Sequence, residues 1–210
     1  MGIAERKERE KQQRKDEIVQ AAEKIFFSMG LEQATMEDIA TEAELSKGTL
    51  YLYFKSKEDL HFEVARRAIA LLSSHTARAV ESAGNAIDKL EQMGRATIAF
   101  GHSHPKHMIA ILSIMGTEAG SLELSSGDVQ GIVYGESSVG MLMKVVEEGI
   151  DEGLIRSDIP AALIAHTLWM QMMSVIQFMH TERSLIEMLD LTPEKVFESH
   201  FQLVFNGITS

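Results

Sequence analysis

The sequence predicts an all-α protein with a small N-terminal helix-turn-helix head, a larger C-terminal helical bundle and about nine helices. Three observations lead to this fold class. The 210 residues contain only three prolines, strand-like alternation of apolar and polar residues is scarce, and apolar residues recur at the helical period of 3.6 over long segments. Apolar residues make up 45% of the chain, which is enough to build a core.

Four helices are predicted in the N-terminal part. Apolar residues at helical spacing define the first, and Gly30 ends it because glycine readily adopts the left-handed conformation of a helix terminus. Each of the other three follows a Ser or Thr whose hydroxyl can accept a hydrogen bond from a free amide of the first turn. The expected helices are about 9–29, then 36–43 capped by Thr35, 47–53 capped by Ser46, and 57–80 capped by Ser56.

Five more helices are predicted in the C-terminal part. A proline lies at or near the start of three of them, where its missing amide hydrogen costs nothing. The Gly- and Ser-rich segment 116–127 predicts a loop. The expected helices are about 86–101, 105–115, 128–152, 160–181 and 193–206.

Composition and missing motifs argue against several classes of protein. The chain has no cysteine, which rules out disulfides, thiol nucleophiles and cysteine-bound zinc. No uninterrupted apolar run reaches the roughly 18 residues of a membrane helix, and the first 15 residues are charged, so a cytoplasmic protein without membrane attachment is expected. No nucleophile elbow, phosphate-binding glycine loop or zinc-protease motif occurs, so neither enzymatic activity nor a cofactor is predicted.

The charge balance does not by itself indicate a nucleic-acid partner. The net charge is −11, and residues 1–60 carry 10 Lys and Arg against 13 Asp and Glu. Affinity for DNA would therefore have to come from a locally basic surface and not from the field of the whole protein.

The two short helices near the N-terminus have the spacing of a helix-turn-helix, whose second helix can enter the major groove. Leu50 and Phe54 are four residues apart and are expected to point inward, with Leu45 and Ile39. This leaves a lysine, a glycine and two tyrosines nearer the outside, where they could reach phosphates. Spacing alone leaves an ordinary helical corner as an equal alternative.

Two runs in this region closely resemble the DNA-binding signature of the TetR family of transcriptional regulators. They are TMEDIA at 35–40 and LSKGTLYLYFKSKEDL at 45–60, and the likeness extends over about 15–65. The resemblance implies contacts with phosphates, base edges and thymine methyl groups, with Leu52 helping to set operator preference. The DNA-binding residues that it implies are Thr35, Ser46, Lys47, Gly48, Thr49, Tyr51, Leu52, Tyr53 and Lys57.

The resemblance also implies the organisation of the rest of the chain. A DNA-binding domain at 1–58 would precede a ligand-binding and dimerisation domain at 59–210, and the segment 148–158 is similar to the turn before that family's dimerisation helices. A homodimer would form through about 160–181 and 193–206, and would bind a near-palindromic operator as a repressor.

A small apolar effector in the C-terminal body would release the repressor from its operator. Thirteen methionines support an adaptable apolar site, although each one alone is equally well explained as core filler. The expected ligand-binding residues are Met93, Phe100, Met108, Ile111, Met115, Met141, Trp169 and Met173.

Three features keep a second interpretation open. The first 15 residues hold six Lys and Arg, which suits either a minor-groove arm or a solvated helix extension. Glycines at 127, 131 and 135 suit either close helix packing or a frayed helix start. His102, His104 and His107 do not share one helical face, which favours loop or cap residues over a metal site, and a metal hydrolase built on them is the enzymatic rival. A helix-turn-helix surface that binds protein instead of DNA is the third hypothesis.

Overall fold

The computed structural model describes residues 2–81, 83–115 and 138–209. Ten α-helices and no β-strand occur in these ranges, which confirms the all-α prediction. Nine of the ten correspond to predicted helices. The additional one, α10 (Arg183–Met188), is a six-residue helix that the sequence analysis did not predict. The predicted loop at 116–127 and the glycines at 127, 131 and 135 lie outside the described residues.

The chain divides into two compact units, which are described separately. The head unit contains the residues up to Ala68 together with the end of α6 from Ser113, and the body unit contains Ile69–Leu112 and the described residues from 138 onward. Helix α4 is continuous, and it begins in the head unit and ends in the body unit. The functional division at residue 58 remains a prediction.

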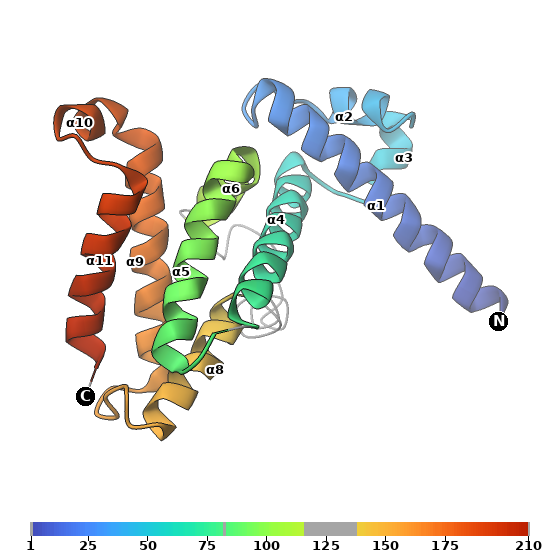
Figure 1. Cartoon of the computed structure of the whole chain (residues 1–210). Helices are drawn as coiled ribbons and strands as arrows, with labels where there is room; N and C mark the ends of the chain where they lie inside the picture. Colours follow the sequence, from blue (N-terminus) through green and yellow to red (C-terminus); the bar gives the residue numbers. More distant parts are fainter. Residues whose placement is uncertain (1, 82, 116–137, 210) are drawn as a thin grey trace. The chain divides into compact units, whose positions relative to one another are not determined.

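The head unit is built on a long first helix and two short ones (Figure 1). Its centre includes side chains with no exposed surface, among them Ile18, Ala22, Ile39, Leu50 and Leu60. They come from all four helices of the unit, so burial of apolar surface joins the helix-turn-helix to its neighbours. The four helices are α1 (Ile3–Met29), α2 (Met36–Glu42), α3 (Lys47–Tyr51) and α4 (Lys57–Val80).

Helix α1 begins six residues earlier than predicted. Residues 4–14 are exposed and form a polar helical extension whose charges include the Arg6–Glu10 pair at 2.7 Å. At the other end, the predicted stop at Gly30 is confirmed, since its φ of 85° lies in the region that L side chains rarely adopt. Its amide donates to the carbonyl oxygen of Phe26, which closes the last turn.

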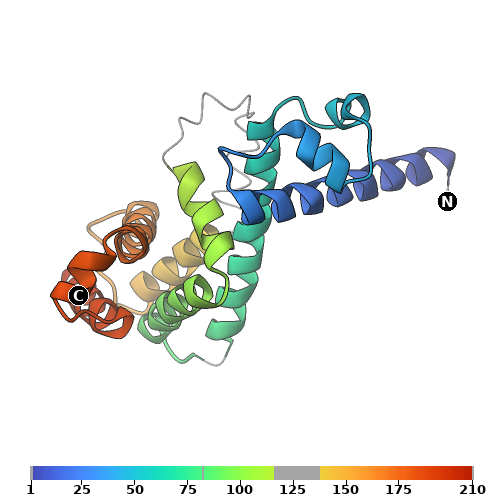
Figure 2. The same ribbon diagram turned by 90° about the horizontal axis from the view of Figure 1, so that it is seen from above.

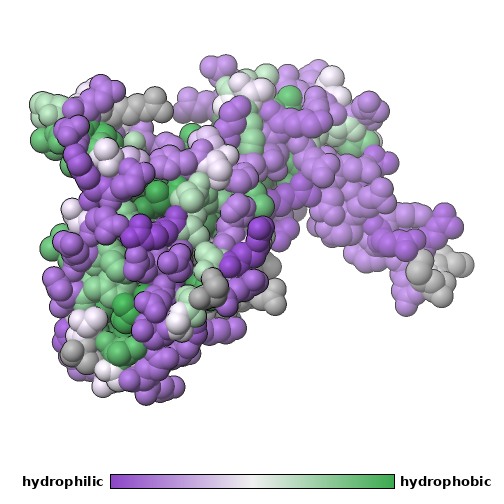
Figure 3. All heavy atoms as spheres, in the orientation of Figure 1, coloured by the Kyte–Doolittle hydropathy of each residue, from purple (hydrophilic) through white to green (hydrophobic). Residues whose placement is uncertain are grey.

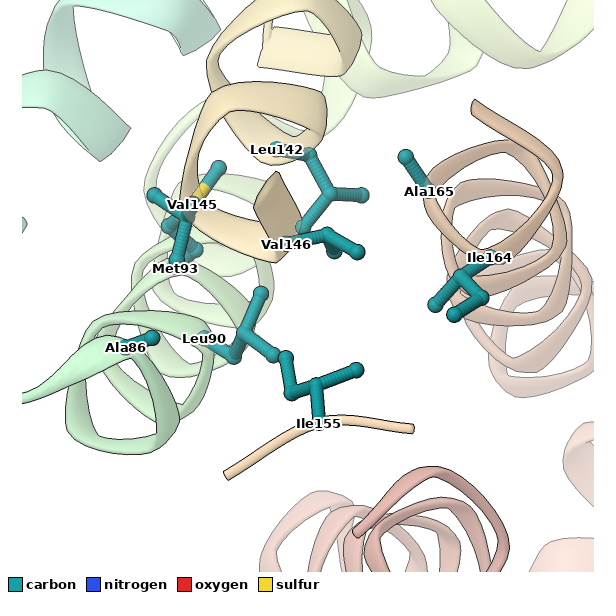
Figure 4. Close-up of a cluster of buried hydrophobic side chains, with 9 residues drawn as sticks. All are labelled: Ala86, Leu90, Met93, Leu142, Val145, Val146, Ile155, Ile164 and Ala165. Atoms are coloured by element: carbon teal, nitrogen blue, oxygen red, sulfur yellow. The ribbon is translucent and has the colours of Figure 1, made fainter. Parts of the chain in front are cut away.

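The body unit is a bundle in which α9 and α11 lie side by side (Figures 1 and 2). A core of buried hydrophobic side chains lies between α5, α8 and α9, where Leu90, Val146 and Ile164 come together (Figure 4). Ile155, in the turn after α8, is 1% exposed and closes one end of this core. The body helices are α5 (Ala86–Ser103), α6 (Pro105–Met115), α8 (Ser138–Asp151), α9 (Ala161–Thr181), α10 and α11 (Pro193–Ile208).

Helix α9 is apolar over much of its circumference, yet it is not covered within one protomer. Among the described helices, α9 is the one that is long and apolar enough to cross a membrane. The mean hydropathy of its most apolar 18-residue stretch is 1.2, and only 22% of this stretch is buried. Leu163 and Met170 on α9 are 58% and 61% exposed, and Leu203 on α11 is 76% exposed. Hydrophobic side chains also gather at the surface over α11 in Figure 3. A soluble protomer does not usually leave such a surface without a partner.

Candidate functional site

The first helix of the helix-turn-helix is fixed by a reciprocal cap. The Asp38 amide donates to Thr35 Oγ1 at 3.2 Å, while the Thr35 amide and hydroxyl donate to Asp38 Oδ2 at 3.0 and 2.6 Å. The hydrogen bond from the Thr35 hydroxyl is the main cause that lowers the pKa of the Asp38 carboxyl group. The predicted cap at Thr35 is thus confirmed, and with Asp38 it forms a capping box, while Thr35 remains exposed at the start of α2.

The turn between α2 and α3 brings the second helix to the surface of the head unit. Glu44 adopts a φ of 54°, and the Leu45 amide returns to the carbonyl oxygen of Ala40 at 2.8 Å. Ser46 then caps α3, because its Oγ accepts the Thr49 amide at 3.1 Å. These local bonds determine the direction in which α3 leaves the turn.

The two faces of α3 separate as the sequence predicts. Leu50 is fully buried and Phe54 is 7% exposed, whereas Tyr51 is 46% and Leu52 is 82% exposed. An isolated leucine this exposed is unfavourable in water, but it suits contact with a thymine methyl group or a sugar. The remaining predicted residues also lie at or near this surface: Ser46, Lys47 and Gly48 are exposed, and Thr49 and Tyr53 are half-buried.

Two of the predicted DNA-binding lysines already have partners in the head unit. Lys47 Nζ is 3.7 Å from a carboxylate oxygen of Glu37, and both side chains are more than half exposed. Lys57 Nζ donates to the carbonyl oxygens of Leu31, Glu32 and Ala34 at 2.8, 3.3 and 3.0 Å. Lys57 therefore holds the loop between α1 and α2, and its phosphate contact remains a prediction that would compete with these bonds.

The body unit contains a cavity that is partly open to solvent, with about 570 Å³ of space between its walls when the open side is included. Its walls come from α4, α5, α8, α9 and α11 and are mainly apolar. The lining side chains are Thr76, Leu90, Met93, Thr97, Ser138, Leu142, Leu168, Trp169, Met172, His200, Phe201, Val204 and Phe205, with Gly94 between them.

The cavity brings together only part of the predicted ligand-binding set. Met93 and Trp169 line it, while Met141 packs against the core cluster and the side chain of Met115 lies outside the described part. Four others are core residues with at most 1% exposure and do not line this cavity: Phe100, Met108, Ile111 and Met173. Helical periodicity cannot distinguish a core residue from a cavity residue, so an effector role for these four remains a prediction.

Sequence reasoning did not identify the polar residues of this cavity. Thr76, Ser138 and His200 were not singled out, because a lone Thr, Ser or His on an amphipathic helix carries no recognisable signal. Burial lowers the pKa of the His200 imidazole, which favours its neutral form.

The three histidines His102, His104 and His107 do not form a single cluster in the structure. His102 is exposed near the end of α5, whereas His104 and His107 join His75 around Phe100, with His104 stacked on that ring at 4.8 Å. Within the ranges that the structure describes, no group of three or more potential ligand side chains is arranged to hold a metal ion.

The capped helix-turn-helix with an exposed second helix, on the same chain as a helical body with an apolar cavity, defines the class as a DNA-binding transcriptional regulator. The profile described as "Bacterial regulatory proteins, tetR family" matches residues 18–64. A regulator from Bacillus subtilis, the uncharacterized HTH-type transcriptional regulator YhgD, is 30% identical over 145 residues, covering 68% of this chain and 72% of its own. The chain belongs to the TetR family of transcriptional regulators.

Two further proteins show the extent of this similarity. The HTH-type transcriptional repressor KstR2 of Mycolicibacterium smegmatis is 29% identical over 202 residues, covering 93% of this chain and 91% of KstR2. The crystal structure of the regulator FadR from Bacillus subtilis in complex with stearoyl-CoA superposes with a TM-score of 0.67. It is 20% identical, and the match covers 91% of this chain and 98% of the FadR chain.

Proposed function

We propose that the protein is a cytoplasmic TetR-family repressor that binds a near-palindromic operator as a homodimer and is released by a small apolar effector. The observation that carries the DNA part is the exposed face of α3. Tyr51 and Leu52 stand out from a helix whose opposite face is anchored by the fully buried Leu50. A rigid helix that presents hydroxyl, ammonium and methyl groups suits contact with both the backbone and the base edges.

The head reaches DNA despite the acidic chain because its basic groups are concentrated near the N-terminus. Residues 6–15 carry six Lys and Arg, and Lys47 and Lys55 lie on or directly after the helix-turn-helix. Surface ion pairs such as Lys47 with Glu37 are weak, so a phosphate can displace the carboxylate at little cost. Thr35, Ser46 and the rest of the predicted surface then fix the register of the head on the duplex.

In a homodimer, the second protomer would cover the apolar surface of α9 and α11 that is exposed in a single protomer. Leu163, Met170 and Leu203 together present an apolar surface on two neighbouring helices that one protomer leaves exposed. Pairing these helices with their copies across a two-fold axis would bury that surface and place two heads on one assembly. Two heads related in this way read half-sites of a palindrome.

The effector would occupy the body cavity. Its apolar lining suits a hydrophobic molecule. The similar FadR structure was determined in complex with stearoyl-CoA, which contains a long hydrocarbon chain. Helix α4 supplies Thr76 to the cavity and begins at Lys57 in the head unit. A ligand that favours one arrangement of this helix would change operator affinity by a coupling free energy of about 1–3 kcal/mol, or some 5- to 150-fold.

The test is selection of random duplex DNA by the full-length protein, followed by titration of the winning sequence between about 50 and 200 mM salt. We expect a palindromic sequence, a stoichiometry of one dimer per site and a steep fall in affinity with salt. Leu52→Ala should change sequence preference, whereas the matched variant Ile109→Ala, at an exposed position of α6, should retain that preference. An absence of enrichment together with flat salt dependence would refute DNA binding and favour a protein partner.

A further inference from the structure

The body cavity differs from a purely hydrophobic site in one respect, which concerns its polar groups. Four of its lining side chains can form hydrogen bonds through oxygen or imidazole nitrogen, and they are Thr76, Thr97, Ser138 and His200. None of the lining residues is a Lys, Arg, Asp or Glu. The direction in which the hydroxyl hydrogens point then determines which ligand the cavity accepts.

The hydroxyl hydrogens of the two threonines are already used inside their own helices. Thr97 Oγ1 donates to the carbonyl oxygen of Met93 at 2.8 Å, and Thr76 Oγ1 donates to those of Leu72 and Ser73 at 3.2 and 3.0 Å. Because a hydroxyl group has one hydrogen and two acceptor lone pairs, both threonines can only accept a hydrogen bond from a ligand.

The hydroxyl hydrogen of Ser138, at the start of α8, is also already used in a hydrogen bond. Ser73 Oγ donates to the carbonyl oxygen of Ile69 at 2.9 Å, so in the 3.1 Å contact between Ser73 and Ser138 the donor is Ser138. Ser138 is 2% exposed, and its remaining capacity is also that of an acceptor. The three hydroxyl groups of the cavity therefore present lone pairs and no free hydrogen.

The donors of the cavity are the two nitrogen-containing rings. Within the described residues, the side chains of His200 and Trp169 have no hydrogen-bond partner. A neutral imidazole offers one donor and one acceptor, and an indole offers one donor. Since His200 has a lowered pKa through burial, it does not provide a positive charge at neutral pH.

On this basis we infer that the cavity binds an uncharged, mainly hydrocarbon molecule that carries a hydrogen-bond donor, such as an alcohol. The inference rests on the proposed function for the place of the effector, and it specifies the effector's chemistry. A hydroxyl group can donate to a threonine oxygen while it accepts from His200 or Trp169. A carboxylate could accept from His200 or Trp169, but it would also meet three hydroxyl groups that act only as acceptors and no cation, so most of its hydration would be lost without replacement.

The chain contains an internal probe for this test. Trp169 is the only tryptophan of the 210 residues and lines the cavity, so its fluorescence reports occupancy directly. Four ligands with the same ten-carbon chain would be titrated into the full-length protein: 1-decanol, decyl methyl ether, decanoate and decanoyl-CoA. Calorimetry would give the affinities. We expect 1-decanol to bind at least about tenfold more tightly than the ether and than decanoate, a difference well within the effect of one unpaired buried polar group.

A matched pair of variants tests the part played by the threonine oxygens. Thr97→Val removes an acceptor from the cavity and should abolish most of the preference for the alcohol over the ether. Thr181→Val removes the same type of bond, from Oγ1 to the carbonyl oxygen of Gln177 at 3.0 Å, at an exposed site on α9 and should leave the preference unchanged. Decanoyl-CoA distinguishes two sources of the hydrocarbon: if it binds more tightly than 1-decanol, the inference is overturned and the ligand is a thioester whose charged part stays in solvent.

The inference is overturned if decanoate binds as tightly as 1-decanol, if the ether equals the alcohol, or if no ligand changes the emission of Trp169. These measurements do not involve DNA, so they separate the ligand's chemistry from the release of the operator. A ligand that occupies the cavity with the expected preference but leaves operator affinity unchanged supports the inference and refutes only the proposed release.

Discussion

Replacement of Lys57 by Met tests whether this residue is primarily part of the head's structure. Its ammonium group donates to three carbonyl oxygens of the loop between α1 and α2, at 2.8, 3.0 and 3.3 Å. A hydrogen bond from a charged donor contributes about 1.5–3 kcal/mol. This side chain is only partly buried, however, so in the Met variant water can donate hydrogen bonds to much of the carbonyl surface that loses its partner. We therefore expect a net loss of about 1–3 kcal/mol in unfolding free energy, and a Tm lower by about 2–4 °C for each kcal/mol.

The matched control is Lys24→Met in the same unit. Lys24 Nζ lies 3.0 Å from a Glu42 carboxylate oxygen, but its side chain is 72% exposed, so we expect a loss between about 0 and 1 kcal/mol. Urea unfolding followed by circular dichroism would measure both variants. Equal losses would refute the argument that the three carbonyl bonds hold the loop. Operator titration of folded Lys57→Met tests the predicted phosphate contact separately, since a real contact lowers the salt slope by about 0.9 for each of the two heads of the dimer.

Three further predictions test other parts of the structure. Ser46→Ala and Thr192→Ala each remove an N-cap and should each lower the unfolding free energy by about 1 kcal/mol. Only Ser46→Ala should also weaken operator binding. Equal operator affinities of the two variants in a DNA titration would contradict the role of α3. Gly94→Ala would place a Cβ 2.7 Å from the ring of Phe197 and should destabilise the body by about 1–3 kcal/mol, and an unchanged urea midpoint would exclude this clash. Burial lowers the pKa of His200, so the imidazole of the unfolded chain is protonated before that of the folded protein as the pH falls through about 6.5. The free energy of unfolding should therefore decrease on acidification, and it should decrease less in His200→Gln. Identical pH profiles of the two proteins would contradict this expectation.

The head could be predicted from sequence because its determinants are local. Thr35, Ser46 and Ser56 each bond to groups three residues away, and the three helix starts follow from this spacing. The inward positions of Leu50 and Phe54 follow equally from helical geometry over four residues. In contrast, the bonds of Lys57 reach back 23 to 26 residues, and no sequence pattern announces them.

The body cavity could be predicted in kind but not in detail. Its walls come from five helices, and whether an apolar residue faces the cavity or the core depends on a small rotation of each helix. Met93 and Phe100 show this, because both are buried on α5 and only Met93 lines the cavity. The short helix α10 was missed for a different reason: its six residues are too few for a helical period to be recognised.

The two proposals meet in helix α4. Its first turn is capped by Ser56 and Asp59 in the head unit, and Thr76 on the same helix lines the cavity. Lys57 and Thr76 are 19 residues apart, about 28 Å at the helical rise, with no proline or glycine between them. An uninterrupted helix transmits a displacement of one end to the other because its backbone hydrogen bonds resist bending. A ligand that donates to Thr76 Oγ1 would therefore act on the helix whose opposite end carries Lys57, so the proposed ligand chemistry and the proposed release of DNA would depend on the same structural element.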